Sequence, residues 1–226
     1  MDIEEVAVLK EKIGFVGGKS YDIILLFART LTCFGEKVLI ADRNIFHTLA
    51  SAIPVPEGLQ PGKQIVSYDG IFYTESERNE EELTGYDFVL YDFGMVMHRE
   101  LMQCSMVYVV SGCLPHHIQQ LRNLCLPKNK VRGIIFRDLL KKGQKDGTEI
   151  KELLSEYPEC RTRFLKQEYL DQKNCFVYET THEYRLRDAS EQMQELIYTI
   201  FSDVYTEVEE KSFWKRIRKL ERKGYL

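Results

Sequence analysis

The chain has 226 residues, of which 44% are hydrophobic and 29% charged, so it can bury one sizeable core and is not a disordered or fibrous protein. The formal net charge is −4, yet residues 211–226 carry seven Lys or Arg and one Glu, so a tail of +6 follows a body of −10. A basic tail on an acidic body indicates a separate role for the tail, and the acidic body makes a nucleic-acid partner unlikely.

The same sequence predicts a cytoplasmic protein. No apolar run approaches the ~18 residues of a membrane-spanning helix, and residues 1–5 are acidic, so we expect neither a span nor a secretory signal. Six cysteines without a CxxC pair, several inside apolar runs, predict reduced core thiols. Peripheral attachment at the inner face of the membrane is a further candidate location, because of the basic tail.

The first part of the chain alternates short apolar runs with helical patterns. Residues 6–9 and 12–16 are predicted strands, and apolar residues at helical spacing predict a helix over 20–34 that ends at Gly35. Residues 37–41 are a predicted buried parallel strand. A loop rich in proline and glycine follows at 54–62, and then a hairpin over 64–73 that turns at Asp69-Gly70.

The second part continues the alternation. Predicted strands cover 86–91, 106–110, 132–136 and 176–178, a short helix follows the first of them, and another helix opens at Pro115. A polar loop covers 141–148 and a long amphipathic helix 187–205. This order predicts an α/β domain over 1–205, with a mostly parallel sheet, helices on both faces, and ligands bound beyond the carboxyl ends of the strands.

A candidate phosphate loop, Gly17-Gly18-Lys19-Ser20, lies between a predicted strand and a predicted helix, where backbone amides and a helix N-terminus can hold an anion. The full pattern is Gly, four residues, then Gly-Lys-Ser/Thr, but Ile13 stands at the first glycine position and Gly14 is one residue too close. The loop is therefore short of amides, and Asp22 in the next helical turn would repel phosphate. A tight turn with a solvated lysine, residual nucleotide binding and hydrolysis all stay open.

Three segments together resemble the ParA/MinD family of P-loop ATPases. They are Gly14–Leu26, the stretch 35–42 (GEKVLIAD) and the stretch 86–94 (YDFVLYDFG), the last similar to a Walker B strand and its ending. Residues 104–110 (CSMVYVV) resemble the strand that comes next in the family. The resemblance covers roughly residues 12–205, and the atypical, tight-adherence pilus-assembly subgroup is the most similar.

The resemblance implies a P-loop NTPase fold with ATP and Mg²⁺ as cofactors. It assigns phosphate binding to the turn, Mg²⁺ binding to a hydroxyl and a carboxylate, and the orientation of water to a second carboxylate. The residues at those positions are, for phosphate, Gly17, Gly18, Lys19 and Ser20; for Mg²⁺, Ser20 and Asp92; and for water, Asp42.

Two positions depart from the family pattern. The signature lysine, five residues before the loop lysine, is Gly14 here, and Tyr21 replaces a small Thr or Ser. Both departures count against hydrolysis more than against the fold. From the residues alone, Asp42 can instead end its strand and cap the next turn, and Asp92 can accept hydrogen bonds from amides of its own loop.

Residues 206–226 are predicted to contain a basic amphipathic helix. One face is apolar and the other is cationic, which is typical of helices that lie on an anionic membrane and is similar to the family's C-terminal membrane-targeting helix. Packing on the body or on a second subunit is the alternative, and nucleic acid is a weaker one. The candidate contact residues are Phe213, Trp214, Ile217 and Leu220 with Lys215, Arg218, Lys219 and Arg222.

These features lead us to expect a degenerate ParA/MinD-like protein with weak or no ATPase activity. It would act as a localisation or assembly factor for a surface-secretion or pilus-type machine, as a homodimer with a protein partner. An active ATPase with nucleotide-dependent dimerisation and a ligand-free structural scaffold are the alternatives.

Overall fold

The computed structural model describes residues 11–55, 59–140, 147–181 and 185–221. Its strands are β1 Glu11–Gly17, β2 Val38–Asp42, β3 Val66–Tyr68, β4 Ile71–Thr74, β5 Phe88–Asp92, β6 Met106–Gly112, β7 Val131–Leu139 and β8 Arg161–Lys166. Its helices are α1 Tyr21–Cys33, α2 Thr48–Ser51, α3 Glu80–Leu83, α4 Pro115–Arg122, α5 Thr148–Glu156, α6 Tyr169–Thr181, α7 Glu191–Val204 and α8 Glu210–Glu221, with 3-10 turns η1 Arg99–Gln103, η2 Lys128–Lys130 and η4 Leu186–Asp188.

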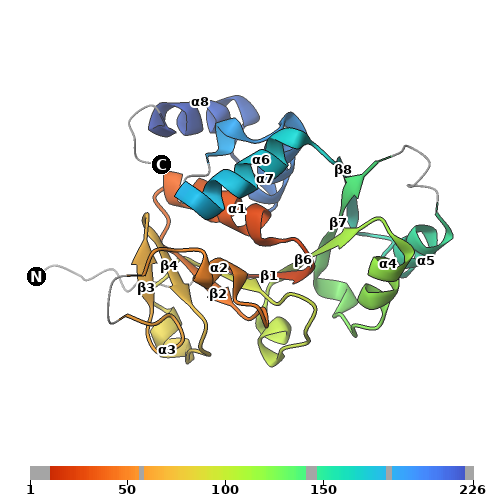
Figure 1. The fold of residues 1–226 in the computed structure, drawn as a ribbon, viewed down its shortest axis with the longest axis horizontal. Helices are drawn as coiled ribbons and strands as arrows, with labels where there is room; N and C mark the ends of the chain where they lie inside the picture. The colour runs from red at the N-terminus through yellow and green to blue at the C-terminus, as the bar shows by residue number, and fades with distance from the viewer. Residues whose placement is uncertain (1–10, 56–58, 141–146, 182–184, 222–226) are drawn as a thin grey trace, which may run out of the picture.

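The strands form one eight-stranded sheet in the order β3-β4-β2-β5-β1-β6-β7-β8. Every pair is parallel except β3 and β4, which form the predicted antiparallel hairpin. Figure 1 shows α1, α6, α7 and α8 on one side of the sheet and α4 and α5 on the other. The predicted α/β sheet with helices on both faces is therefore confirmed.

Two apolar cores lie on the two faces of the sheet, because alternate residues of a strand point to opposite faces. Ile13 and Phe15 of β1 belong to the core beneath α1, α7 and α8, whereas Val16 belongs to the core beneath α4 and α5. The central strands read as unbroken apolar runs in the sequence because both of their faces are covered.

Helix α1 crosses the middle of the first face. All of its residues except Tyr21 and Thr32 are buried, so it is apolar on nearly every side, as expected for a helix covered by other helices. It ends at Cys33, and the chain turns away at the predicted Gly35, whose φ of +88° suits glycine and whose amide donates to the Thr32 carbonyl at 2.9 Å.

Residues 148–178 differ from the prediction. Residues 176–178 lie in α6 rather than in a strand, and Phe176, 68% exposed, faces solvent there. Helix α5 and strand β8 were not predicted. Strand β8 has three exposed basic residues among its six and only one buried residue, Leu165, so it lacks the apolar run that identified the inner strands. Residues 6–9, a predicted strand, and 141–146 of the predicted loop lie outside the described residues.

Helix α8 packs on the body of the molecule. Phe213 and Ile217 are buried in the core that also contains α1 and α7, and the Phe213 ring lies 5.7 Å from Phe34 and 4.9 Å from Phe201, centroid to centroid. Two of the four apolar side chains that were candidates for contact with a membrane or a partner are thus covered by the body itself, which is the alternative that the amphipathic pattern left open. No helix in the described ranges is long and apolar enough to cross a bilayer.

Truncation of Phe213 tests whether α8 stabilises the fold. Because the ring is fully buried among other aromatic rings, Phe213→Ala should lower the free energy of unfolding by about 3–5 kcal/mol in chemical denaturation. Phe46→Ala is the control: that ring is 78% exposed, so its loss should change stability by less than ~0.5 kcal/mol. Equal stability of the two variants would contradict the docking of α8.

Candidate functional site

The residues predicted to bind nucleotide and metal lie at the carboxyl edge of the sheet, whereas the predicted contact residues of α8 lie elsewhere. Strand β1 lies between β5 and β6, and it leads through Gly18, Lys19 and Ser20 into α1. Asp42 ends β2 and Asp92 ends β5, and the two aspartates are register partners on adjacent parallel strands. This is the edge at which parallel α/β sheets bind ligands.

Asp92 accepts hydrogen bonds from three different segments. The Ser20 hydroxyl donates at 3.0 Å and the Gly94 amide at 3.1 Å to Oδ1, and the Asn44 side-chain amide donates at 3.4 Å to Oδ2. Burial, and then the charge of Asp42, raise the pKa of Asp92 to about 6. The Ser20–Asp92 pair predicted for Mg²⁺ is therefore in direct contact, within a buried environment that disfavours the charged carboxylate.

Asp42 holds the start of α2. Its Oδ2 accepts from the amides of Leu49 at 2.8 Å and Ala50 at 2.9 Å, and its Oδ1 accepts from the Asn44 amide at 3.2 Å. Burial raises the pKa of this carboxyl also, against the effect of the three amides. These contacts correspond to the capping role that the residues alone had suggested for Asp42.

The strand before the turn stays in the sheet to its last residue. The Gly17 amide donates to the Gly94 carbonyl at 2.7 Å, and the Phe93 amide donates to the Phe15 carbonyl at 2.9 Å, so the ladder between β1 and the end of β5 continues. Glycine is required at 17, because φ is +122° and a Cβ there would lie 1.8 Å from the Val110 carbonyl oxygen. The connection to α1 is left with three residues.

Lys19 is turned toward β7. Its φ of +64° is in the left-handed region, and its ammonium group contacts the carboxylate of Asp138. Arg137, the preceding residue, donates to the Lys19 carbonyl at 2.5 Å. Two consecutive residues of β7 thus hold both the backbone and the side chain of Lys19.

The same Arg137 neutralises Asp22. Its two Nη groups donate to the two carboxylate oxygens of Asp22, which is fully buried. The repulsion that Asp22 was predicted to exert on an anion is therefore offset by a partner. Arg137 and Asp138 were missed, although they follow directly after the predicted strand 132–136 and so had to lie at the same edge.

A small cavity of about 210 Å³ adjoins the turn on the α4 side, with Gly18, Lys19 and His117 in its lining. The His117 ring lies on Gly112, where a Cβ would come within 2.2 Å of Nδ1. Burial, and then the charges of His116 and Lys19, lower the pKa of His117, so the ring is neutral at pH 7. Within the described ranges, no three His, Cys, Asp or Glu side chains form a metal-binding group.

The residues of this edge suit the two expected cofactors unequally. A hydroxyl and a carboxylate are the hard oxygen ligands that Mg²⁺ accepts, and Ser20 with Asp92 supplies them. A phosphate loop surrounds its anion with successive amides, whereas here the Gly17 amide is bonded to Gly94 and the turn is three residues long. The edge thus fits a cation better than a phosphate group.

No protein-family model and no curated protein match the sequence, but solved structures match the fold. The MinC:MinD cell division protein complex of Aquifex aeolicus aligns with a TM-score of 0.60 and 14% identity, over 85% of this chain and 96% of that chain. The chain has the fold of the ParA/MinD P-loop NTPases.

Two further structures agree. A McdA–ATP complex from Cyanothece aligns with a TM-score of 0.59 and 10% identity, over 89% of this chain and 98% of that chain. A ParA family ATPase from Chlorobium tepidum aligns with a TM-score of 0.56 and 13% identity, over 84% of this chain and 99% of that chain. The fold class predicted from the sequence is confirmed over most of the chain.

The raised pKa of Asp92 gives a pH-dependent prediction. The folded state keeps the proton up to about pH 6, whereas the unfolded chain releases it near the ordinary value of 3.8, so the stability due to this proton is lost as pH rises between those values. Asp92→Asn should therefore raise the free energy of unfolding by about 1–3 kcal/mol above pH 6, with the gain vanishing below pH 4. Denaturation curves over this pH range measure it, and a gain independent of pH would contradict the assignment.

A second prediction concerns the buried Arg137–Asp22 pair. Arg137→Met should cost about 3–5 kcal/mol of stability, because it leaves the Asp22 carboxylate buried without its partner. Adding Asp22→Asn should recover most of the loss, since the second change removes the unpaired charge. A double variant as unstable as the single one would show that packing rather than charge is responsible.

Proposed function

We propose that this chain is a ParA/MinD-like protein with weak or no ATPase activity, which acts as a localisation or assembly factor. The observation that carries the proposal is the hydrogen bond between the Gly17 amide and the Gly94 carbonyl. This bond keeps Gly17 paired within the sheet, at a position where the backbone of a phosphate loop would already have separated from the strand. Phosphoryl transfer depends on donors that stabilise charge in the transition state, and this turn supplies few of them.

The position of Lys19 supports the same conclusion. The loop lysine of a working site reaches the terminal phosphates, whereas Lys19 contacts Asp138. An exposed ion pair of this kind is weak, so a nucleotide would displace it at little cost. The proposal therefore rests mainly on two features: the turn has few free amides, and Gly14 stands at the position of the signature lysine. The pairing of Lys19 is weaker support.

Exposed apolar side chains at the same edge support a role in assembly. Ile45 and Phe46, in the loop after β2, are 66% and 78% exposed, and Met97 and Leu114 follow β5 and β6. Apolar groups that collect at one edge of a soluble domain are typical of a protein contact. A second copy of this chain or another protein would be the partner, as in the MinC:MinD complex that shares the fold. The resemblance to the tight-adherence subgroup supports a secretion or pilus-type machine as the assembly.

The second candidate is an active ATPase with nucleotide-dependent dimerisation. It is favoured by the contact between Ser20 and Asp92 and by the position of Asp42 next to Asp92. These are the residues to which the family resemblance assigns Mg²⁺ and water. If the turn changes its conformation when nucleotide binds, Ser20 and Asp92 are already in position to hold Mg²⁺.

Turnover measurements separate the two candidates. With ATP and Mg²⁺, we expect turnover indistinguishable from background, equal to that of Lys19→Ala, and calorimetry should give no binding tighter than about 1 mM. Lys63→Ala removes an exposed lysine from the loop before β3, outside the turn between β1 and α1, and is the matched control. Turnover that is lost in Lys19→Ala but kept in Lys63→Ala would establish the active ATPase instead.

A further inference from the structure

A second cavity, of about 450 Å³, lies between the C-terminal end of α1 and helix α8. Among the described residues its lining contains three cations, Lys215, Arg216 and Lys219, and no carboxylate. Ser212, Leu220 and Cys33 complete that lining. Helix α1 has 13 residues and spans about 20 Å, so this cavity is at the opposite end of α1 from the turn at Gly18-Lys19-Ser20.

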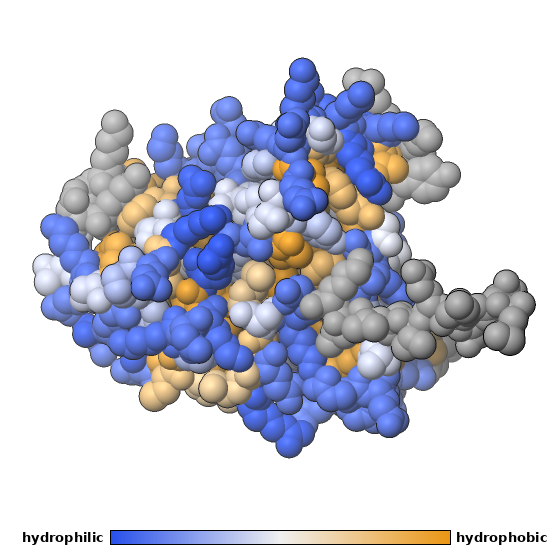
Figure 2. All heavy atoms as spheres, turned by 180° about the vertical axis from the view of Figure 1, so that it is seen from behind, coloured by the Kyte–Doolittle hydropathy of each residue, from blue (hydrophilic) through white to orange (hydrophobic). Residues whose placement is uncertain are grey.

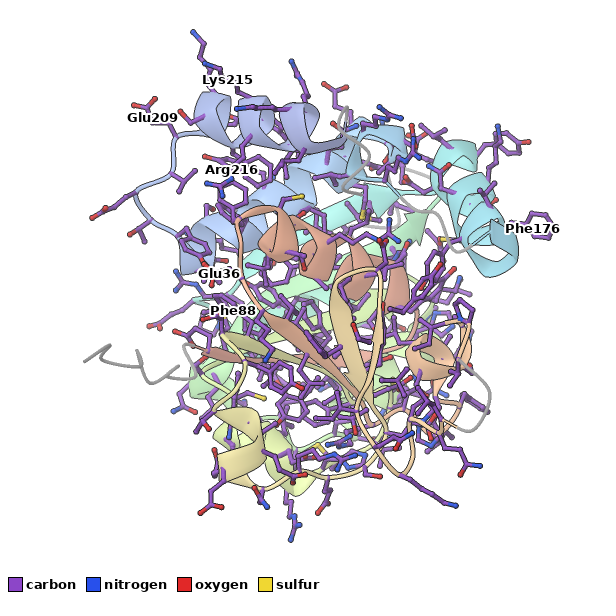
Figure 3. The ribbon with its side chains drawn as sticks, turned by 90° about the vertical axis from the view of Figure 1, so that its left-hand side faces the viewer. Glu36, Phe88, Phe176, Glu209, Lys215 and Arg216 are labelled. Atoms are coloured by element: carbon purple, nitrogen blue, oxygen red, sulfur yellow. The ribbon has the colours of Figure 1, made fainter. Side chains whose placement is uncertain are left out.

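Arg216 is held in a fixed position at this cavity. Its Nε donates to the Cys33 carbonyl at 3.2 Å, and its guanidinium lies 4.6 Å from the centre of the Phe34 ring. Figure 3 shows Arg216 beneath α8, on the side of the body, and Lys215 on the outer side of the helix. The two Nη groups of Arg216 donate no hydrogen bond to the described residues, so they are available to a ligand.

Three lysines of α8 have no carboxylate partner among the residues that the structure describes. Lys211, Lys215 and Lys219 are exposed and four residues apart, so they follow one another along the same side of the helix, and none of them pairs with a carboxylate of the described chain. Like charges at this spacing destabilise a helix. In Figure 2 hydrophilic side chains cover the outer surface of this region at the top of the molecule. A bound anion would relieve the repulsion.

From these contacts we propose that the cavity between α1 and α8 binds a phosphate group, carried by a soluble phosphorylated molecule or by a lipid headgroup. A guanidinium presents paired donors that match phosphate oxygens, Lys219 and the Ser212 hydroxyl supply further donors, and Lys215 adds positive charge from the outer side of the helix. Helix α8 stays docked when the ligand binds, because Phe213 and Ile217 are buried in the core. The site is independent of the proposed function.

Binding is measured by calorimetry with pyrophosphate, and by co-sedimentation with vesicles of phosphatidylcholine, with and without phosphatidylglycerol. The double variant Lys215→Ala, Lys219→Ala should weaken binding roughly thirtyfold. The control Lys151→Ala, Lys173→Ala removes the same charge from exposed positions on α5 and α6 and should change binding less than twofold. Arg216→Lys keeps the charge but removes the planar donor pair, so it should also weaken binding.

Trp214 reports whether α8 stays docked. It is the only tryptophan in the chain, it is half-buried, and its ring meets Phe213 edge-on at 4.8 Å. When vesicles bind to the docked protein, the emission maximum of Trp214 should stay the same and brominated lipids should not quench it. Melting curves of all variants, measured in parallel, establish that each of them folds.

The source of the phosphate follows from which probe binds. Pyrophosphate binding that the Lys215, Lys219 double variant loses supports the site with a soluble ligand. Vesicle binding that needs phosphatidylglycerol and leaves Trp214 unchanged supports it with a lipid. Binding of neither probe, equal loss in the control variant, or quenching of Trp214 by brominated lipids would overturn the proposal.

Discussion

Strand β1 remains hydrogen-bonded on both sides up to Gly17, and the arrangement of the whole carboxyl edge depends on this. The Gly17–Gly94 bond fixes the loop after β5 against β1, which in turn places Asp92 beneath the Ser20 hydroxyl. It also shortens the connection to α1, so that Lys19 must adopt a positive φ to make the turn. The carboxyl edge therefore presents a hydroxyl and a carboxylate that suit a cation, whereas the short turn leaves few free amides for a phosphate group.

Ion pairs within the protein satisfy much of the remaining charge at this edge. Arg43 donates to both carboxylate oxygens of Glu100, at 2.7 and 2.9 Å, and both side chains are almost completely buried. This pair ties the loop after β2 to η1, as the Arg137–Asp22 pair ties β7 to α1. Removing one member of such a pair leaves a buried charge uncompensated, so the edge is fixed by the protein without any ligand.

The sequence predicted well those features that depend on burial alone. The inner strands are apolar runs because both faces are covered, and the aspartates that follow two of them had to meet, since parallel strands end at the same edge. The same reasoning reaches Arg137, but not its pairing with Asp22, which depends on the distance between β7 and the first turn of α1. Strand β8 was not predicted, because it lies at the edge of the sheet and its charged side chains interrupt the apolar run by which a buried strand is recognised.

Helix α8 shows a different limit. Its amphipathic pattern correctly marked Phe213 and Ile217 as the buried side, but periodicity does not identify what covers that side. The covering surface is built by Phe34 and Phe201, which are distant in sequence, so only the tertiary structure distinguishes a docked helix from one that lies on a membrane.

The charged residues of β8 have a consequence for aggregation. In the described sheet both outermost strands would be templates for a strand from another molecule, because one side of each is unpaired. Strand β3 is only three residues long, and β8 presents exposed Arg161, Arg163 and Lys166 along its length. A neighbouring strand at β8 would have to place its own residues against these cations. The exposed charged residues that made β8 unpredictable from the sequence thus also protect this edge of the sheet from pairing with other chains.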